Sequence, residues 1–227
     1  MAFEVGHSLR SLLWLFGHSF VAWPLGRYFF DFEIIGGEYV PLRGGVLVAS
    51  NHVSYFDPPF LGNATPRVMY YMARAELFRH PLFSGLIRAW GAFPIGRNMW
   101  SAGGLKEALR KLKAGRLVLF FPEGTRSYDG NLAKPMAGAG LLVHNAYPAP
   151  VIPAYIEGTF QVMPRGAKAP RRAKVTVSFG PPLDFSKYRE GKADKEKYAA
   201  IAHELMAAIA ALRDALPAAR CADARRR

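Results

Sequence analysis

Residues 46–59 read VLVASNHVSYFDPP, an apolar run that passes directly into a polar segment. The run Val46–Ala49 predicts a β-strand, and comparable runs recur along the chain between stretches of helical periodicity. The further predicted strands are Val68–Met72, Leu117–Phe121, Pro150–Ile156 and Lys174–Phe179. Strands and helices that alternate in this way indicate an α/β fold, which we expect to contain a mixed, largely parallel sheet flanked by helices.

The predicted helices fill intervals between these strands. They cover Ala75–Trp90, residues 105–112 ahead of Gly115, Ala139–Tyr147 and about Asp194–Leu216. The stretch Met163–Lys174, rich in Pro, Lys and Arg, is interpreted as a surface loop. With 227 residues, of which 51% are hydrophobic, the chain is long enough for one domain with a sizeable core.

The N-terminal segment is apolar but interrupted. Residues 11–26 contain no Asp, Glu, Lys or Arg, yet they are fewer than the roughly 20 apolar residues that span a bilayer. On a helical projection one side gathers the apolar side chains Leu9, Leu12, Leu13, Phe16, Phe20 and Trp23. We therefore expect residues 1–32 to form an amphipathic interfacial helical segment that contacts a membrane through residues 3–30, followed by a domain of residues 33–227. The alternative is a helix that packs on the protein's own core.

The formal net charge of +13 favours partners that carry phosphate or present an anionic surface. Part of this charge lies in the tail Arg225–Arg227 and around Arg171, so generic solubility is the alternative explanation. The sequence has no zinc-finger spacing, RNP-like aromatic strand or Gly-rich nucleotide loop, and we therefore expect no nucleic-acid partner. No His, Cys or Asp cluster has the spacing of metal ligands, so we expect no metal. The single cysteine, Cys221, cannot form an internal disulfide.

His52 and Asp57 lie five residues apart in the polar segment after the first predicted strand. Strand ends are where α/β folds form their binding crevices, so these two side chains are candidate catalytic residues. An imidazole can act as a general base near neutral pH, and a carboxylate bonded to its second nitrogen fixes the tautomer. Because the motif holds no paired nucleophile, the base would activate a hydroxyl of the substrate. The alternative is that Asp57 caps a helix beginning at Pro58, and that His52 is an ordinary surface or core residue.

A second polar motif, FFPEGTRS at residues 120–127, follows another predicted strand. Gly124 permits close backbone approach, Thr125 and Ser127 offer hydroxyl groups, and Arg126 offers a planar fork for phosphate. The same residues could form an ordinary Pro-Gly turn. The two motifs together are far more specific than either one alone.

Four blocks of the sequence resemble, in order, those of the glycerolipid acyltransferase family, whose bacterial members include 1-acylglycerol-3-phosphate acyltransferases. The blocks are NHVSYFD at 51–57, GAFPIGR at 91–97, FPEGTRS at 121–127 and VIPAYIEGT at 151–159. The resemblance extends from about Gly44 to Phe185 and so covers most of the chain. It implies that residues 33–227 form an acyltransferase domain.

The resemblance also implies roles for individual residues. His52 would be the general base and Asp57 its orienting partner. The phosphate and acceptor site would be formed by Arg97, Glu123, Gly124, Thr125, Arg126 and Ser127. Pro153 would lie near the acyl-donor region. A carboxylate such as Glu123 would repel phosphate, so we expect it to orient Arg126 or the acceptor hydroxyls instead.

The implied reaction transfers a fatty acyl group from an acyl-thioester to the free hydroxyl of 1-acylglycerol 3-phosphate, which gives phosphatidate for phospholipid biosynthesis. The donor would be acyl-coenzyme A or acyl carrier protein, no cofactor would be needed, and the enzyme would act at the cytoplasmic face of the cell membrane. Many relatives have an Asp where this chain has Gly96, and an aromatic-Lys pair where it has Pro135 and Met136. These departures concern the acceptor, so glycerol 3-phosphate, a lyso-ornithine lipid and a glycolipid are alternative acceptors. A non-catalytic basic membrane-binding module is a more distant alternative, because it would not need His52 and Asp57.

Overall fold

The computed structural model describes residues 30–96 and 102–224, with side chains described as far as residue 216. The predicted interfacial segment lies outside the described residues except for residues 30–32. Arg97 lies outside them as well. The membrane contact predicted for residues 3–30 and the predicted role of Arg97 therefore stay predictions.

The described residues form strands, α-helices and short 3-10 turns. The strands are β1 (Phe32–Ile35), β2 (Val46–Ser50), β3 (Met69–Arg74), β4 (Ala92–Ile95), β5 (Leu117–Phe120), β6 (Val151–Glu157) and β7 (Val175–Phe179). The α-helices are α3 (Asp57–Asn63), α4 (Pro81–Ala89), α5 (Ala102–Lys113), α6 (Ala137–Ala146), α7 (Thr159–Val162) and α8 (Lys195–Ala224). The 3-10 turns are η2 (Gly37–Tyr39), η3 (Ala75–Phe78) and η4 (Ser186–Tyr188). All five predicted strands are confirmed within a few residues, and β1 and β4 are additional to the prediction.

The strands form one sheet in the order β1-β7-β6-β2-β5-β3-β4. The pairs β6·β2, β2·β5, β5·β3 and β3·β4 are parallel. At the other edge β7 runs antiparallel to β6, and β1 runs parallel to β7. The sheet is therefore mixed and largely parallel, which confirms the predicted fold class.

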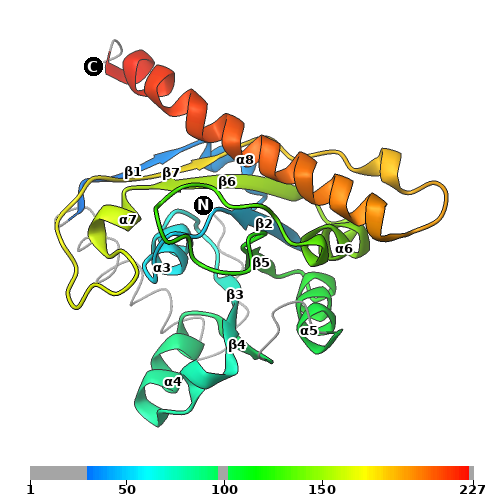
Figure 1. Ribbon diagram of the computed structural model, residues 1–227, viewed down its shortest axis with the longest axis horizontal. Helices are drawn as coiled ribbons and strands as arrows, with labels where there is room; N and C mark the ends of the chain where they lie inside the picture. Colours follow the sequence, from blue (N-terminus) through cyan, green and yellow to red (C-terminus); the bar gives the residue numbers. More distant parts are fainter. Residues whose placement is uncertain (1–29, 97–101, 225–227) are drawn as a thin grey trace.

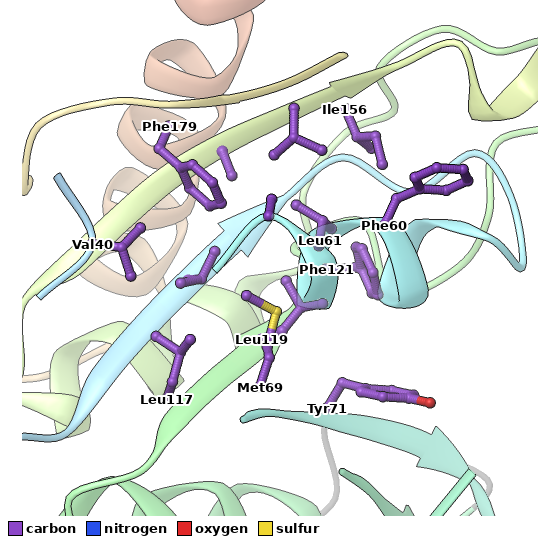
Figure 2. Packing of buried hydrophobic residues seen from close by; sticks show 14 of the residues in the cluster. Val40, Phe60, Leu61, Met69, Tyr71, Leu117, Leu119, Phe121, Ile156 and Phe179 are labelled. Carbon is purple, nitrogen blue, oxygen red and sulfur yellow. The ribbon is translucent and has the colours of Figure 1, made fainter. Parts of the chain in front are cut away.

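Helices cover both faces of the sheet. Leu47 and Ala49 of β2 belong to the apolar cluster completed by α5, α6 and α8, whereas Val46 and Val48 belong to the cluster completed by α3, α4 and α7. Figure 1 shows α8 lying along the sheet. Figure 2 shows the cluster on the side of α3, where Phe60 packs among side chains of the strands. Because β2 is buried on both faces, it reads in the sequence as a continuous apolar run.

The single helix predicted over Ala75–Trp90 is wrong, because two elements occupy that stretch. The turn η3 ends at Phe78 and the helix α4 begins at Pro81. Between them His80 is extended, with φ −84° and ψ 119°. Proline disfavours a helical conformation in the residue before it and has no N–H to donate, so Pro81 starts a helix more readily than it continues one.

Candidate active site

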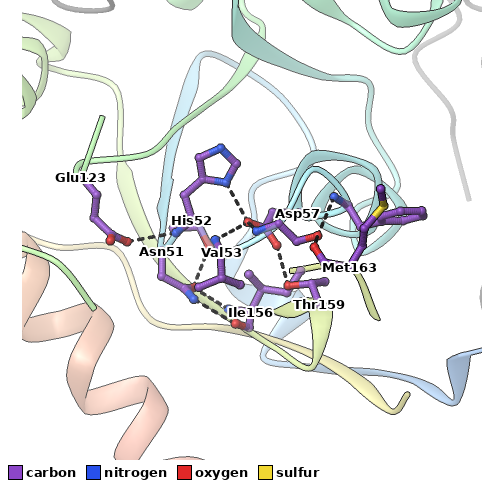
Figure 3. Close-up of polar contacts among 11 residues, drawn as sticks. Asn51, His52, Val53, Asp57, Glu123, Ile156, Thr159 and Met163 are labelled. Carbon is purple, nitrogen blue, oxygen red and sulfur yellow. Dashed lines mark hydrogen bonds and ion pairs between the residues drawn. The ribbon is translucent and has the colours of Figure 1, made fainter. Parts of the chain in front are cut away.

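Parallel pairing brings the two polar motifs to the same edge of the sheet. Ala49 of β2 lies opposite Phe120 of β5, and the two strands run in the same direction. His52 comes three residues after Ala49, and Glu123 comes three residues after Phe120. Both residues therefore lie just beyond the carboxyl-terminal ends of their strands, an end of the sheet that we call its carboxyl edge. The backbone N–H of His52 donates to Oε1 of Glu123 at 3.0 Å (Figure 3). The strand register therefore creates the site by joining loops that lie far apart in the sequence.

Asp57 orients the ring of His52. The two side chains meet through Nδ1 of His52 and Oδ2 of Asp57, which are 2.7 Å apart (Figure 3). The Asp57 side chain is fully buried, whereas the His52 side chain keeps 15% exposure. When Nδ1–H donates to a carboxylate, the lone pair of the neutral imidazole is on Nε2. His52 can therefore accept a proton at Nε2 from a bound group.

The carboxylate of Asp57 has further donors that hold it in place. Its Oδ2 also accepts the backbone N–H groups of Val53 at 2.7 Å and Ser54 at 2.8 Å. Its Oδ1 accepts the hydroxyl of Thr159 at 2.5 Å. Both carboxylate oxygens are thus engaged, and a buried charge with this many donors stabilises one orientation.

The interpretation of Asp57 as a helix cap is wrong. Phe56 is the N-cap of α3, no side chain caps this helix, and Asp57 is its first residue. The side chain of Asp57 instead bonds the chain that precedes the helix. Its negative charge also lies at the helix N-terminus, where the helix dipole favours an anion.

Thr159, Phe121 and Asn51 support the site, although the sequence analysis assigned a role to none of them. The ring of Phe121 stacks on the ring of His52, with centroids 3.9 Å apart and planes 11° apart. Asn51 bonds the backbone of Ile156, donating to its carbonyl at 3.0 Å and accepting from its N–H at 2.8 Å. All three residues fall within the sequence blocks quoted above, which was the available signal. Spacing alone could not show which side chains would turn toward His52.

Glu123 contacts backbone rather than Arg126. Its Oε1 accepts from His52 and its Oε2 accepts the N–H of Ala133 at 2.9 Å. Burial raises the pKa of Glu123 to about 7, although the two backbone hydrogen bonds act in the opposite direction. The carboxylate of Glu123 therefore links the loop that follows β2 to the loop that follows β5. This role differs from the expected one, in which Glu123 orients the side chain of Arg126.

The residues after Glu123 form a tight loop. Gly124 has φ 72°, and its N–H donates to the carbonyl of Phe121 at 3.0 Å. Ser127 donates its N–H to the carbonyl of His52 at 2.8 Å, and its hydroxyl bonds Asp129 and Gly130. The hydroxyl of Ser127 thus helps to build the loop.

Among the predicted binding residues of this loop, Arg126 and Thr125 have side chains that are not buried. Thr125 is exposed, and the guanidinium of Arg126 lies over the ring of Tyr55, 3.4 Å from its centroid. Stacking on an aromatic face restrains the guanidinium and leaves its N–H groups at the rim free to point outward. Arg126 therefore places a positive charge, held by its contact with Tyr55, beside the loop that carries His52.

Pro153 lies apart from these residues. It is buried in β6 opposite Ala49. Its ring packs close to Gly180, which also faces Leu212 of α8. It therefore belongs to the α8 side of the sheet, whereas His52 stacks on a residue of the α3 side. The structure does not bring Pro153 together with the His52 cluster.

The described part of the chain contains no group of three or more His, Cys, Asp or Glu side chains placed to hold a metal ion. Among these same residues, no helix is both long enough and apolar enough to cross a bilayer. The groups that the site offers are the imidazole of His52, the carboxylate of Asp57 and the nearby guanidinium of Arg126.

The His-Asp pair at the carboxyl ends of this sheet's strands agrees with the class of acyl-transferring enzymes that the sequence blocks indicate. A family model described as "Acyltransferase" matches residues 31–157. The chain belongs to this acyltransferase family, which confirms the family and the enzyme class expected from the sequence.

Relatives and a solved structure show the same similarity. The 1-acyl-sn-glycerol-3-phosphate acyltransferase of Bacillus subtilis is 26% identical over 185 residues, which cover 81% of this chain and 89% of that protein. The protein of the same name from Streptococcus pneumoniae is 32% identical over 143 residues, which cover 62% of this chain and 50% of that one. The crystal structure of the 1-acyl-sn-glycerophosphate acyltransferase PlsC from Thermotoga maritima superposes with a TM-score of 0.67 at 25% identity, covering 85% of this chain and 77% of that one.

Proposed function

We propose that the protein transfers a fatty acyl group from an acyl-thioester to the free hydroxyl of 1-acylglycerol 3-phosphate and so forms phosphatidate for phospholipid biosynthesis. The observation that carries the proposal is the oriented imidazole, with Nδ1 of His52 held 2.7 Å from Asp57. The names of the relatives support the same acceptor. The proposal extends what those proteins are named for to this chain.

In the proposed mechanism, Nε2 of His52 removes the proton from the acceptor hydroxyl while the hydroxyl oxygen attacks the carbonyl carbon of the thioester. The tetrahedral adduct then collapses, the carbon–sulfur bond breaks, and the leaving thiolate takes the proton from the imidazolium. Asp57 stabilises the imidazolium in between by its negative charge. Because no nucleophile is paired with His52 among the residues that the structure describes, the acyl group would pass directly to the acceptor without an acyl-enzyme intermediate.

Arg126 and Arg97 would bind the acceptor phosphate in this proposal, with Thr125 and the backbone of Gly124 as neighbouring donors. Support comes from the half-buried guanidinium that stacks on Tyr55, since a guanidinium can bond two phosphate oxygens at once. The donor would be acyl-coenzyme A or acyl carrier protein, and no metal or cofactor enters the proposed steps. Residues 3–30 would hold the enzyme on the membrane through their apolar side, and the face contacted would be the cytoplasmic one, as the resemblance to the family implies.

The experiment offers purified protein lysophosphatidate, glycerol 3-phosphate and other lyso-lipids, each with acyl-coenzyme A and with acyl carrier protein as donor. Mass spectrometry of the products should show phosphatidate from lysophosphatidate, formed about 10²-fold or more slowly by the His52→Ala variant. Acylation of a different acceptor, such as glycerol 3-phosphate, would move the assignment to that acceptor. An acylated protein trapped with donor alone would overturn direct transfer.

A further inference from the structure

Helix α4 presents a stripe of large apolar side chains to solvent. Leu82 is 82% exposed, and the exposures of Phe83, Leu86 and Trp90 are 44%, 47% and 42%. Leu82, Leu86 and Trp90 follow one another at four-residue spacing, and Phe83 lies next to them on the same side. Within α4, Ile87 alone is buried. The helix thus touches the core with one residue and offers a continuous apolar stripe outward.

This stripe belongs to the part of the sheet that carries the site. Strands β3, β5 and β2 are parallel, so the chain leaves β3 toward η3 and α4 at the same edge where it leaves β2 toward His52. Figure 1 shows α4 beyond β4, at the end of the sheet remote from β1. On the loops of the same edge, Tyr55 and Tyr128 are 56% and 73% exposed.

The charges around the stripe are mainly positive. Arg74 and Arg79 are exposed at the two ends of η3, with one acid, Glu76, between them. Arg88 is exposed on α4 and lies over the ring of Phe78, 4.7 Å from its centroid. An amphipathic helix with Leu, Phe and Trp on one side and arginines beside them is the composition that suits a headgroup boundary. Anionic lipid complements both the local arginines and the net charge of +13.

We infer that α4 is a membrane contact, in which Leu82, Phe83, Leu86 and Trp90 enter the outer part of a bilayer that contains anionic lipid. This contact would hold the carboxyl edge of the sheet against the surface from which a lipid acceptor reaches His52. The inference rests on the proposed function for the identity of that acceptor. It adds a second contact, separate from residues 3–30, on the catalytic domain itself.

The first test compares vesicle binding of Leu82→Glu/Leu86→Glu with that of a matched control, Leu42→Glu. Leu42 is 67% exposed and lies in the segment before β2, at the opposite edge of the sheet. In co-sedimentation with phosphatidylcholine-phosphatidylglycerol vesicles, the α4 variant should bind about tenfold or more weakly, because apolar transfer is lost and charge is added. The control should bind like the wild type. Equal loss in both variants, or loss in neither, overturns the inference.

A second test locates the contact even if the double variant is unstable. A Cys221→Ser background has no other cysteine, so an environment-sensitive dye can be placed at Leu86→Cys or, as control, at Leu42→Cys. Vesicles should shift the emission of the dye at position 86 and leave position 42 unchanged. An apolar emission at position 86 before vesicles are added would show that residues 1–29 or a second copy cover the stripe, and would overturn the inference. So would a dye at position 86 that vesicles do not affect.

An activity assay separates this inference from the proposed function. With short-chain lysophosphatidate dispersed in water, the α4 double variant should turn over like the wild type. With acceptor embedded in vesicles it should be slower in proportion to its weaker binding. If the wild type acylates neither form, the proposed function fails while the vesicle-binding result for α4 still stands.

Discussion

Four of the site's hydrogen bonds converge on Asp57, and its partners come from two places in the chain. His52, Val53 and Ser54 precede it in the loop after β2, and Thr159 reaches it from α7. The imidazole is thereby held in one tautomer and one orientation. A base so arranged depends on the charge of its partner as much as on its position.

Replacing Asp57 by Asn is expected to lower kcat by about 10²-fold or more, because a neutral amide cannot stabilise the imidazolium. His52→Ala should lose a similar factor, since it removes the base itself. Steady-state kinetics on each variant test this, with circular dichroism as the check that both are folded. A kcat near that of the wild type for Asp57→Asn would show that the pair is structural only.

Arg126→Lys is expected to raise KM for the phosphorylated acceptor about tenfold, because lysine lacks the planar fork and cannot stack in the same way on Tyr55. KM for the thioester donor should not change. Arg165→Lys is the matched control, because Arg165 stacks in a similar way on Tyr128, at 3.9 Å, outside the two motifs. Equal effects of the two substitutions would contradict the assignment of Arg126 to the acceptor.

The raised pKa of Glu123 predicts a pH-dependent stability. Its pKa is 4.5 in an ordinary setting and about 7 when folded, so the folded state binds more protons between these two values. The favourable contribution is full below pH 4.5 and declines as pH rises to about 7, by up to about 3 kcal/mol. Urea unfolding at several pH values should show this decline, and Glu123→Gln should remove that part of it. A pH profile unchanged by Glu123→Gln would contradict the prediction.

At the scale of the elements, α6 and α8 approach so closely that a methyl group does not fit between them. A Cβ on Gly140 of α6 would lie 1.8 Å from the carbonyl oxygen of Tyr198 in α8. Gly140→Ala is therefore expected to lower the free energy of unfolding by about 1–3 kcal/mol through overpacking. Gly85→Ala in α4 is the control, because its added methyl meets nothing within 4 Å, and it should be neutral or stabilising. Urea denaturation of both variants makes the comparison.

Elements differ in how far the sequence predicts them. The run at β2 is apolar at four successive positions because both its faces are buried, and it could be recognised. The strands β1 (Phe32–Ile35) and β4 (Ala92–Ile95) are as short as β5, but β1 contains Glu33 and β4 contains Pro94, so neither reads as an uninterrupted apolar strand. The division of Ala75–Trp90 depends on Pro81, a residue that suits a helix start as well as a helix end.

The site was predictable to a similar degree. His52 and Asp57 are five residues apart, so local sequence could pair them, and the structure joins them at 2.7 Å. Thr159 is 102 residues from Asp57, and only the position of β6 beside β2 brings it close. The contacts of Glu123 with backbone N–H groups could not be predicted, because backbone donors look the same at every position of a sequence.

For the molecule as a whole, binding to a bilayer should have an electrostatic and an apolar part. Raising salt shortens the Debye length from about 8 Å at physiological ionic strength to about 3 Å at 1 M, which weakens attraction of the +13 charge to anionic lipid. Binding to phosphatidylglycerol vesicles should therefore fall with salt but not vanish. Binding to neutral phosphatidylcholine vesicles should hardly change. Complete release by salt in co-sedimentation would show that no apolar contact contributes.

The long separation between Asp57 and Thr159 has a consequence for the protein during its synthesis. A ribosome-bound chain that ends after β5 already contains His52, Asp57 and Arg126, yet it lacks the strand that positions the Thr159 hydroxyl. Asp57 then has an unfilled oxygen, and β2 lacks its neighbour β6 on one side. The nascent enzyme should therefore stay inactive until α7 has left the ribosome and docked. Acyl transfer is then delayed until the Thr159 hydroxyl can bond the carboxylate of Asp57.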